Sequence, residues 1–158
     1  MHGPRLFDGI YEGEQDMPTR SGSARYEGFG KDGHGWTSTQ SGALKDQRYG
    51  FGSRFEDGPG TNPEELIAAA HASCFTMALS FALAGAGYND GTLETNARVT
   101  VDKDGDGFTI TSSKLDLKAK VPGIEQDEFT RIAEEAKANC PVSKLLKAEI
   151  TLTHELTQ

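Results

Sequence analysis

The chain has 158 residues, enough for one domain that buries roughly two thirds of its extended surface. Its 24 acidic and 16 basic residues give a formal net charge of -8, which makes nucleic acid and anionic membranes poor partners. Two cysteines do not make a secreted disulfide framework, and the N-terminus carries no apparent secretory signal, so we expect a cytoplasmic protein.

The first predicted elements are two short strands after an irregular N-terminus. Residues 1–22 are rich in glycine, proline and charged residues without periodicity, so we expect a flexible extension there and a single domain over residues 23–158. Arg25–Gly28 and Gly35–Thr39 are typical of strands joined by a glycine-rich turn, which predicts a hairpin. Residues 41–60 read as a glycine-rich connection with aromatic anchors, a kind of loop that often places functional side chains.

The longest predicted element is a helix that begins after Thr61 or Asn62, either of which can cap its free N–H groups, with Pro63 in the first turn. Between Glu65 and Gly85 no residue carries a formal charge, and the helix is apolar nearly all round, as in a protein interior. Its length would also suit a membrane span. Alanine and glycine dominate it, however, and polar residues interrupt it, so we expect a buried core helix and no membrane.

Two strands and a bulge are predicted next. Alternate residues from Leu93 to Val101 lie on one face of a strand, and Phe108 and Ile110 begin its partner after an Asp- and Gly-rich turn. The apolar residues from Leu115 to Val121 occupy odd positions, whereas Phe108 and Ile110 are even. The inward face must therefore switch, and we expect a bulge near residues 112–113.

The remaining elements are a second helix and a last strand. The helix is expected from Glu125 to Asn139, with an apolar stripe of Phe129, Ile132, Ala133 and Ala136, and Pro141 should end it. Residues 148–156 then alternate as a strand. Because strands that follow one another are mostly joined by tight turns, the order predicts an α+β domain with antiparallel sheet and helices packed on it.

Two possible metal motifs are incomplete. Asp102–Gly107 matches the first half of a calcium loop, but position twelve is Ser113 instead of a bidentate glutamate, so we interpret the segment as a hairpin turn. His71 and Cys74 lie three residues apart on the predicted helix, but further ligands at suitable spacing are missing. We therefore expect no metal and interpret His71 as a structural residue.

The two cysteines are stronger candidates for a functional site than the metal motifs. Cys74 shares a predicted apolar stripe with Met77 and Phe81, where burial would raise its pKa and leave it inert. Cys140 lies eleven residues after Phe129, about three helical turns, and so falls on the apolar stripe of the second helix. Two lone cysteines on the buried faces of two helices can meet in one core.

A difference between the thiols follows from their positions. Cys140 stands at the C-terminal end of its helix, where the dipole disfavours a thiolate, whereas Cys74 is in mid-helix and needs a nearby cation. Arg54 is the nearest candidate on a preceding loop. The pair fits peroxide reduction, in which Cys74 attacks and Cys140 closes a disulfide. Inert core cysteines, or a cysteine hydrolase with His71 as base, are the alternatives.

Two motifs resemble a known family. Gly60–Phe75, with the sequence GTNPEELIAAAHASCF, and the downstream Cys-Pro-Val-Ser of residues 140–143 look like the OsmC branch of the OsmC/Ohr peroxiredoxins. The resemblance extends from about Gly22 to the end of the chain. It implies an α+β, OsmC-like fold, with antiparallel sheets packed around long central helices in an intertwined homodimer.

The resemblance also implies a function. It is that of a thiol-dependent peroxidase of the oxidative stress response, which reduces organic hydroperoxides in preference to hydrogen peroxide. A dithiol such as a lipoyl group or lipoylated protein would recycle it, with no bound cofactor. Four site residues carry over: Cys74 as the peroxidatic cysteine, Cys140 as the resolving cysteine, Glu64 of the Asn-Pro-Glu motif, and Arg54 as the OsmC-branch arginine, with Arg25 and Arg48 as fallbacks.

The helix separates two of these residues. Glu64 and Cys74 would lie about 15 Å apart along a continuous helix and roughly 80° apart around it, so they cannot touch directly. Either Arg54 bridges a bend in the helix, or Arg54 and Glu64 of one subunit serve Cys74 of the other, which is the hypothesis we favour. A non-catalytic dimeric binding protein with structural cysteines is the alternative to an enzyme.

Overall fold

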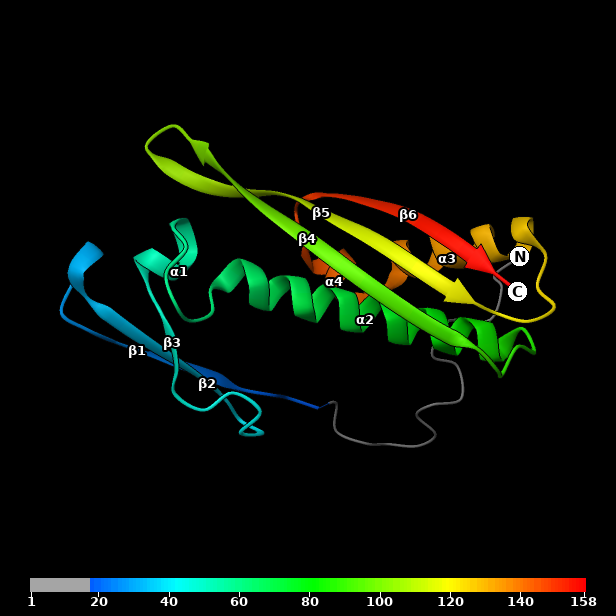
Figure 1. Cartoon of the computed structure of the whole chain (residues 1–158), viewed down its shortest axis with the longest axis horizontal. Coiled ribbons are helices and arrows are strands. Elements are labelled where there is room, and N and C mark those ends of the chain that lie inside the picture. The colour runs from blue at the N-terminus through cyan, green and yellow to red at the C-terminus, as the bar shows by residue number, and fades with distance from the viewer. Residues whose placement is uncertain (1–17) are drawn as a thin grey trace. The chain divides into compact units, whose positions relative to one another are not determined.

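The computed structural model describes residues 18–158, so most of the extension expected over residues 1–22 lies outside the described residues. The described chain divides into two compact units, residues 18–66 and residues 67–158 (Figure 1). Each unit is described by itself below. The expectation of one domain over residues 23–158 stays a prediction.

The first unit contains a small antiparallel sheet. Its strands are β1 (Gly22–Glu27), β2 (His34–Thr39) and β3 (Gln47–Tyr49), in the order β1-β2-β3. The predicted hairpin is β1 and β2, and its turn contains a short 3-10 helix, η1 (Gly30–Asp32). This part of the sequence-based prediction is confirmed.

The connection after β2 is more ordered than the sequence predicts. Residues 41–60 contain β3 and a helix of five residues, α1 (Phe51–Phe55). Both elements are too short to show a hydrophobic period, which is why composition alone suggested a loop. The rings of Phe51 and Phe55, four residues apart, lie 5.3 Å from each other on α1.

The long helix α2 (Pro63–Gly85) begins and ends as predicted. Its burial is different: Phe75 and Leu79 are fully buried, but Met77 is 61% and Phe81 42% exposed. The predicted burial all round, and with it the buried stripe of Cys74, is therefore wrong for the single chain, because neighbouring elements cover only one face. By length and composition α2 could also cross a membrane, so the expected absence of a membrane span stays a prediction.

The larger unit is built on a long antiparallel pair, β4 (Thr92–Asp104) and β5 (Gly107–Lys120). The register shifts where Thr100 pairs with Ser112 but the next residue, Val101, pairs with Ile110. Thr111 is thus the extra residue of a bulge, next to the predicted position. The bulge turns the odd-numbered residues of β5 inward, as the sequence indicated.

The third strand of this sheet departs from the antiparallel prediction. After β5 the chain forms α3 (Gln126–Asn139) and α4 (Pro141–Leu145), and then β6 (Glu149–Thr157) pairs with β5 in parallel. A helical crossover returns the chain to the end of the sheet where β5 began, and this geometry produces a parallel neighbour.

Helices α2 and α3 cover the same face of this sheet (Figure 1). The predicted stripe of α3 is buried as expected. The core between sheet and helices consists of Phe75, Ala78, Leu79, Leu83, Leu115, Leu117, Ala119, Val121, Ile124, Phe129, Ile132, Ala133, Ala136 and Cys140. The predicted α+β class is confirmed, and one of the two cysteines belongs to the core.

Candidate active site

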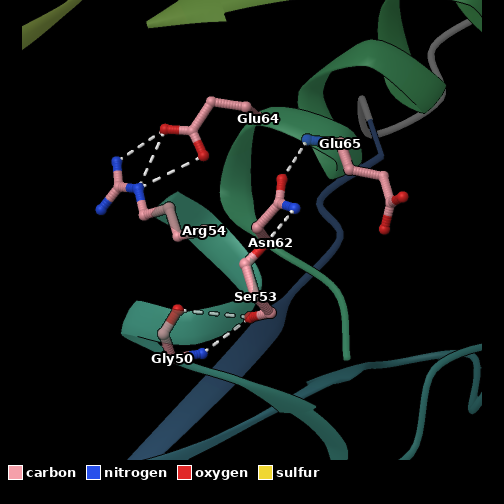
Figure 2. Close-up of polar contacts among 6 residues, drawn as sticks. All are labelled: Gly50, Ser53, Arg54, Asn62, Glu64 and Glu65. Carbon is pink, nitrogen blue, oxygen red and sulfur yellow. Dashed lines mark hydrogen bonds and ion pairs between the residues drawn. The ribbon is translucent and has the colours of Figure 1, made fainter. Parts of the chain in front are cut away.

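Arg54 and Glu64 form a close ion pair in the first unit (Figure 2). Arg54 Nη2 donates to Glu64 Oε1 at 2.7 Å, and Arg54 Nε donates to both carboxylate oxygens, at 3.0 and 3.2 Å. The Glu64 side chain is only 9% exposed, whereas that of Arg54 is 37% exposed. A buried carboxylate thus fixes one edge of the guanidinium, and within residues 18–158 no hydrogen bond uses its remaining nitrogen, Nη1.

Asn62 joins the two short segments that carry this pair. Its Oδ1 accepts the backbone N–H of Glu65 at 2.7 Å and caps α2, while its Nδ2 donates to the carbonyl of Ser53 at 2.9 Å (Figure 2). Ser53 Oγ accepts the N–H of Gly50 at 3.0 Å and donates to the carbonyl of Thr61 at 2.7 Å. These bonds tie α1 to the start of α2, and Arg54 therefore faces Glu64.

Gly60 lets the chain enter α2 from this position. Its φ of 113° lies in the region that favours glycine, and a Cβ there would lie 2.3 Å from the carbonyl oxygen of Arg48. The next residue, Thr61, donates its N–H to that same carbonyl at 2.8 Å. Any larger residue at position 60 would move Thr61 away from β3 and the first turn of α2 away from Arg54.

The two fallback arginines lie elsewhere in this unit. The guanidinium carbon of Arg25 is 4.6 Å from the centre of the Trp36 ring, and that of Arg48 is 5.7 Å from it. Arg48 also hydrogen-bonds His34 Nδ1 at 3.1 Å. Arg54, rather than either of these, is the arginine paired with Glu64.

The second unit brings the two cysteines together. Cys74 on α2 is half-buried and Cys140, between α3 and α4, is fully buried; both are free thiols. Besides the effect of burial, which raises the pKa of both thiols, the two side chains influence each other: the neighbouring Cys140 raises the pKa of Cys74, and Cys74 lowers that of Cys140. The two lone cysteines come together as predicted, but at the edge of the core, since Cys140 belongs to it and Cys74 packs against it.

The environment of Cys140 overturns the prediction that its thiolate is disfavoured. Cys140 has left the helical conformation, with φ -63° and ψ 135°, and stands in front of α4, where its sulfur accepts the N–H of Ser143 at 3.3 Å. Burial raises its pKa, but the influence of nearby His71 and the hydrogen bonds from Ser143 outweigh burial and lower the pKa to about 7. Pro141 ends one helix and begins the next, so the sulfur meets the amide N–H of Ser143 in the first turn of α4.

Cys74 has the opposite environment. Burial raises the pKa of its thiol, and a hydrogen bond from the backbone of Val142 offsets this only in part. The expectation that Cys74 needs a cation for its thiolate therefore agrees with its surroundings.

His71 is fully buried and uses both ring nitrogens. Nδ1 lies 2.6 Å from Ser113 Oγ, and Nε2 lies 2.8 Å from Ser143 Oγ, which is itself 3.1 Å from Cys140 Sγ. His71 thus has satisfied partners, as the sequence interpretation holds, but they lead to Cys140. The sequence contained both serines, yet gave no signal that β5 and α4 would bring them to one histidine.

The metal motifs remain without a site. Within residues 18–158 no group of three or more histidine, cysteine or acidic side chains could hold a metal ion. The calcium-like segment is the turn between β4 and β5, and its Asp104 carboxylate accepts the hydroxyl of Thr109 at 2.6 Å. The interpretation as a hairpin turn is confirmed.

Comparisons with known proteins agree with these features. Residues 56–155 match the family model described as OsmC-like protein. The chain is 52% identical over 137 residues to Peroxiredoxin OsmC of Escherichia coli K12, an alignment that covers 87% of this chain and 96% of that protein. It is 30% identical over 104 residues to Organic hydroperoxide resistance protein-like 2 of Staphylococcus epidermidis, covering 65% and 71% of the two chains. Among solved structures, the organic hydroperoxide resistance protein OhrB of Bacillus subtilis aligns with a TM-score of 0.63 and 26% identity, over 88% of this chain and 98% of that one.

Proposed function

The chain belongs to the OsmC-like protein family, and we propose that this peroxidase reduces organic hydroperoxides, and less efficiently hydrogen peroxide, to alcohols through Cys74 and Cys140. One observation carries the proposal: a half-buried thiol that a peroxide can reach is in contact with a fully buried thiol that can close a disulfide on it. Oxidative stress, in which such peroxides accumulate, is the proposed setting.

The first step is an attack by the Cys74 thiolate. Its sulfur bonds to the terminal oxygen of the hydroperoxide, the O–O bond breaks, and the departing alkoxide takes up a proton to leave as the alcohol. Cys74 becomes a sulfenic acid. Cys140 is fully buried, so the more accessible Cys74 is the thiol that meets the peroxide.

Arg54 is the proposed cation for this step. The thiolate of Cys74 is disfavoured by burial, and a guanidinium can stabilise both that thiolate and the polarised peroxide. The pairing with Glu64 orients the guanidinium and leaves Nη1 for this task.

A homodimer is the proposed form of the enzyme. Because α2 is continuous, Glu64 lies about 15 Å along the axis from Cys74, too far for direct contact. We keep the hypothesis that Arg54 and Glu64 of one subunit serve Cys74 of the other. The exposed Met77 and Phe81 on α2 support a second copy against this helix, and they also supply apolar surface for bulky alkyl peroxides.

The second step restores the enzyme. The Cys140 thiolate attacks the sulfur of the Cys74 sulfenic acid, an S–S bond forms, and hydroxide leaves as water after taking up a proton. An external dithiol, such as a lipoyl group, then reduces the disulfide by thiol exchange and becomes a disulfide itself. No bound cofactor is required, and a cytoplasmic location remains our expectation.

Mass spectrometry after one equivalent of an alkyl hydroperoxide tests the proposal. We expect the rapid loss of two hydrogens and a peptide that links Cys74 to Cys140. A chain that leaves the peroxide unreacted, or that gains oxygen without forming the link, contradicts it. Mixing Glu64→Ala with Cys74→Ser protein under exchange conditions tests the shared site, because only a site built from two subunits regains activity in the heterodimer.

A further inference from the structure

A buried chain of hydrogen bonds leads away from Cys140 to a residue that the proposed reaction leaves without a task. It runs from Cys140 Sγ to Ser143 Oγ at 3.1 Å, from there to His71 Nε2 at 2.8 Å, and from His71 Nδ1 to Ser113 Oγ at 2.6 Å. Ser143 is 8% exposed and the other three residues are not exposed at all. Three elements, α4, α2 and β5, thus contribute to a polar chain inside an apolar core.

When Cys140 is a thiol, the hydrogen-bonded series from Cys140 to Ser113 has one hydrogen for each of its three contacts. The S–H group donates to Ser143 Oγ, the Ser143 hydroxyl donates to His71 Nε2, and His71 Nδ1–H donates to Ser113 Oγ. Each contact then has one donor and one acceptor. In this tautomer Ser113 Oγ accepts from Nδ1–H, and Nε2 carries no proton and can accept from Ser143.

When Cys140 is a thiolate, each of these three contacts still has one hydrogen. After the proton has moved across Ser143, both nitrogens of His71 carry hydrogens, Nε2–H donates to Ser143 Oγ, and the Ser143 hydroxyl donates to the sulfur. The bond to Ser113 is unchanged. No heavy atom has to move between the two states, and the imidazolium and thiolate compensate each other's charge.

We infer that His71 is a positioning residue that accepts the Cys140 proton through Ser143 and so prepares Cys140 to close the disulfide on Cys74. The inference rests on the proposed function, in which Cys140 resolves the sulfenic acid. As the Cys140 sulfur bonds to the Cys74 sulfur, the S–OH bond breaks and hydroxide departs. The proton held on His71 converts the hydroxide to water, and the imidazole is neutral again for the next cycle.

The surroundings of Cys140 support this assignment. The titratable groups that face it are His71 and Cys74, both from α2, and none of the ion pairs found in residues 18–158 includes either group or Cys140. The neighbouring α3 and β6 contribute apolar residues such as Ala136 and Ile150. The pKa of Cys140, lowered to about 7 with His71 as the largest favourable influence, agrees with a proton acceptor at this place.

The rate of disulfide closure as a function of pH tests the inference. The first variant, His71→Gln, can hydrogen-bond Ser143 but cannot hold the Cys140 proton. The second, Ser143→Ala, removes the hydroxyl that links Cys140 to His71. Ser112→Ala is the matched control, since it removes a hydroxyl from the residue next to Ser113 on the opposite face of β5. Each protein is mixed with excess alkyl hydroperoxide, quenched over time and analysed for sulfenic acid and disulfide by mass spectrometry.

The expected result is a slower closure that depends on pH. If the pKa of Cys140 returns from about 7 to its ordinary 9.0, the thiolate fraction at pH 7 falls from about one half to about one in a hundred. A thiolate whose pKa is two units higher is intrinsically about eightfold more nucleophilic. Closure in the His71→Gln protein should therefore be about sixfold slower at pH 7, equal near pH 8, and faster at pH 9.

Other results would overturn the inference. If the rate of disulfide closure falls by the same factor at every pH, His71 has a purely structural role. If the dependence of that rate on pH is unchanged in both variants, His71 has no role in closure. If the unmodified protein itself fails to form the Cys74–Cys140 link, the proposed function fails instead. Should His71→Gln not fold, the Ser143→Ala protein decides, together with a titration of thiolate absorbance in Cys74→Ser protein, where Cys140 is the remaining cysteine. The pKa of Cys140 must then lie below its ordinary 9.0, and must rise once Ser143 is also alanine.

Discussion

Replacement of Arg54 by alanine should slow the attack of Cys74 on peroxide and make it strongly dependent on pH. Burial raises the pKa of Cys74 above 9.0, and only one backbone hydrogen bond from Val142 opposes the shift. Without the proposed cation, the thiolate fraction at pH 7 is therefore at most about one in a hundred. An enzyme whose Cys74 is fully ionised at pH 7 would lose about a hundredfold or more in thiolate fraction, and the greater nucleophilicity of a more basic thiolate would offset part of the resulting loss in rate.

The direction of the pH dependence follows from the chemistry of the thiol. The reactive form of Cys74 appears as its proton leaves, so the rate of the Arg54→Ala protein should rise about tenfold with each pH unit below the raised pKa. The unmodified enzyme, with the guanidinium near the sulfur, should have a flatter profile. The gap between the two proteins should narrow steadily toward alkaline pH.

Single-turnover measurement of peroxide consumption in a stopped-flow instrument provides the assay. Arg131→Ala is the matched control, because Arg131 also pairs with a glutamate, Glu135, at 3.5 Å, but on the exposed surface of α3. Arg54→Lys keeps the charge and loses the fork that makes three contacts with Glu64, so an intermediate rate, reduced roughly tenfold, is expected. An Arg54→Ala protein with the rate and flat profile of the unmodified enzyme would refute the reasoning.

Three further predictions concern the other parts of the molecule. Asn62→Ala should lower the free energy of unfolding by about 1 to 2 kcal/mol in urea titrations and also slow peroxide reduction. Asn62→Asp keeps the helix cap but cannot donate to α1, so it should slow peroxide reduction with a smaller loss of stability. Cys140→Ser should consume one equivalent of peroxide and then stop, with Cys74 as sulfenic acid; full turnover with a dithiol would contradict the resolving role. Phe129→Ala, which empties a fully buried site, should cost about 3 to 5 kcal/mol of stability, and a loss below about 1 kcal/mol would mean that the core rearranges to fill the space.

The elements with a clear period could be predicted from the sequence. The stripe of α3 and the switch of inward face on β5 each occupy the expected residues, because burial of one face imposes a regular spacing. The start of α2 was equally clear, since Asn62 followed by Pro63 and two glutamates satisfies the first turn of a helix. Such patterns depend on neighbours a few residues away, which the sequence contains.

The features that could not be predicted depend on partners far along the chain. Nothing near β6 indicates that it pairs with β5 in parallel, because its direction is set by the crossover through α3 and α4. The exposed face of α2 also carries large apolar residues, Met77 and Phe81, so the spacing of its apolar residues does not say which face meets the sheet. The partners of His71 lie 42 and 72 residues away, on β5 and α4.

The largest correction concerns the prediction that the Cys140 thiolate is disfavoured, and it changes the roles of the two thiols. A helix end predicts a disfavoured thiolate, yet one residue of extended backbone before Pro141 turns the sulfur toward the N–H of Ser143 in α4. In the single chain, the accessible Cys74 is therefore held as a thiol and the inaccessible Cys140 is prepared to ionise. A resolving cysteine prepared in advance shortens the life of the sulfenic acid and limits its further oxidation. On the proposed function, the attacking thiolate forms only where Arg54 reaches it, so reactivity toward peroxide belongs to the assembled enzyme.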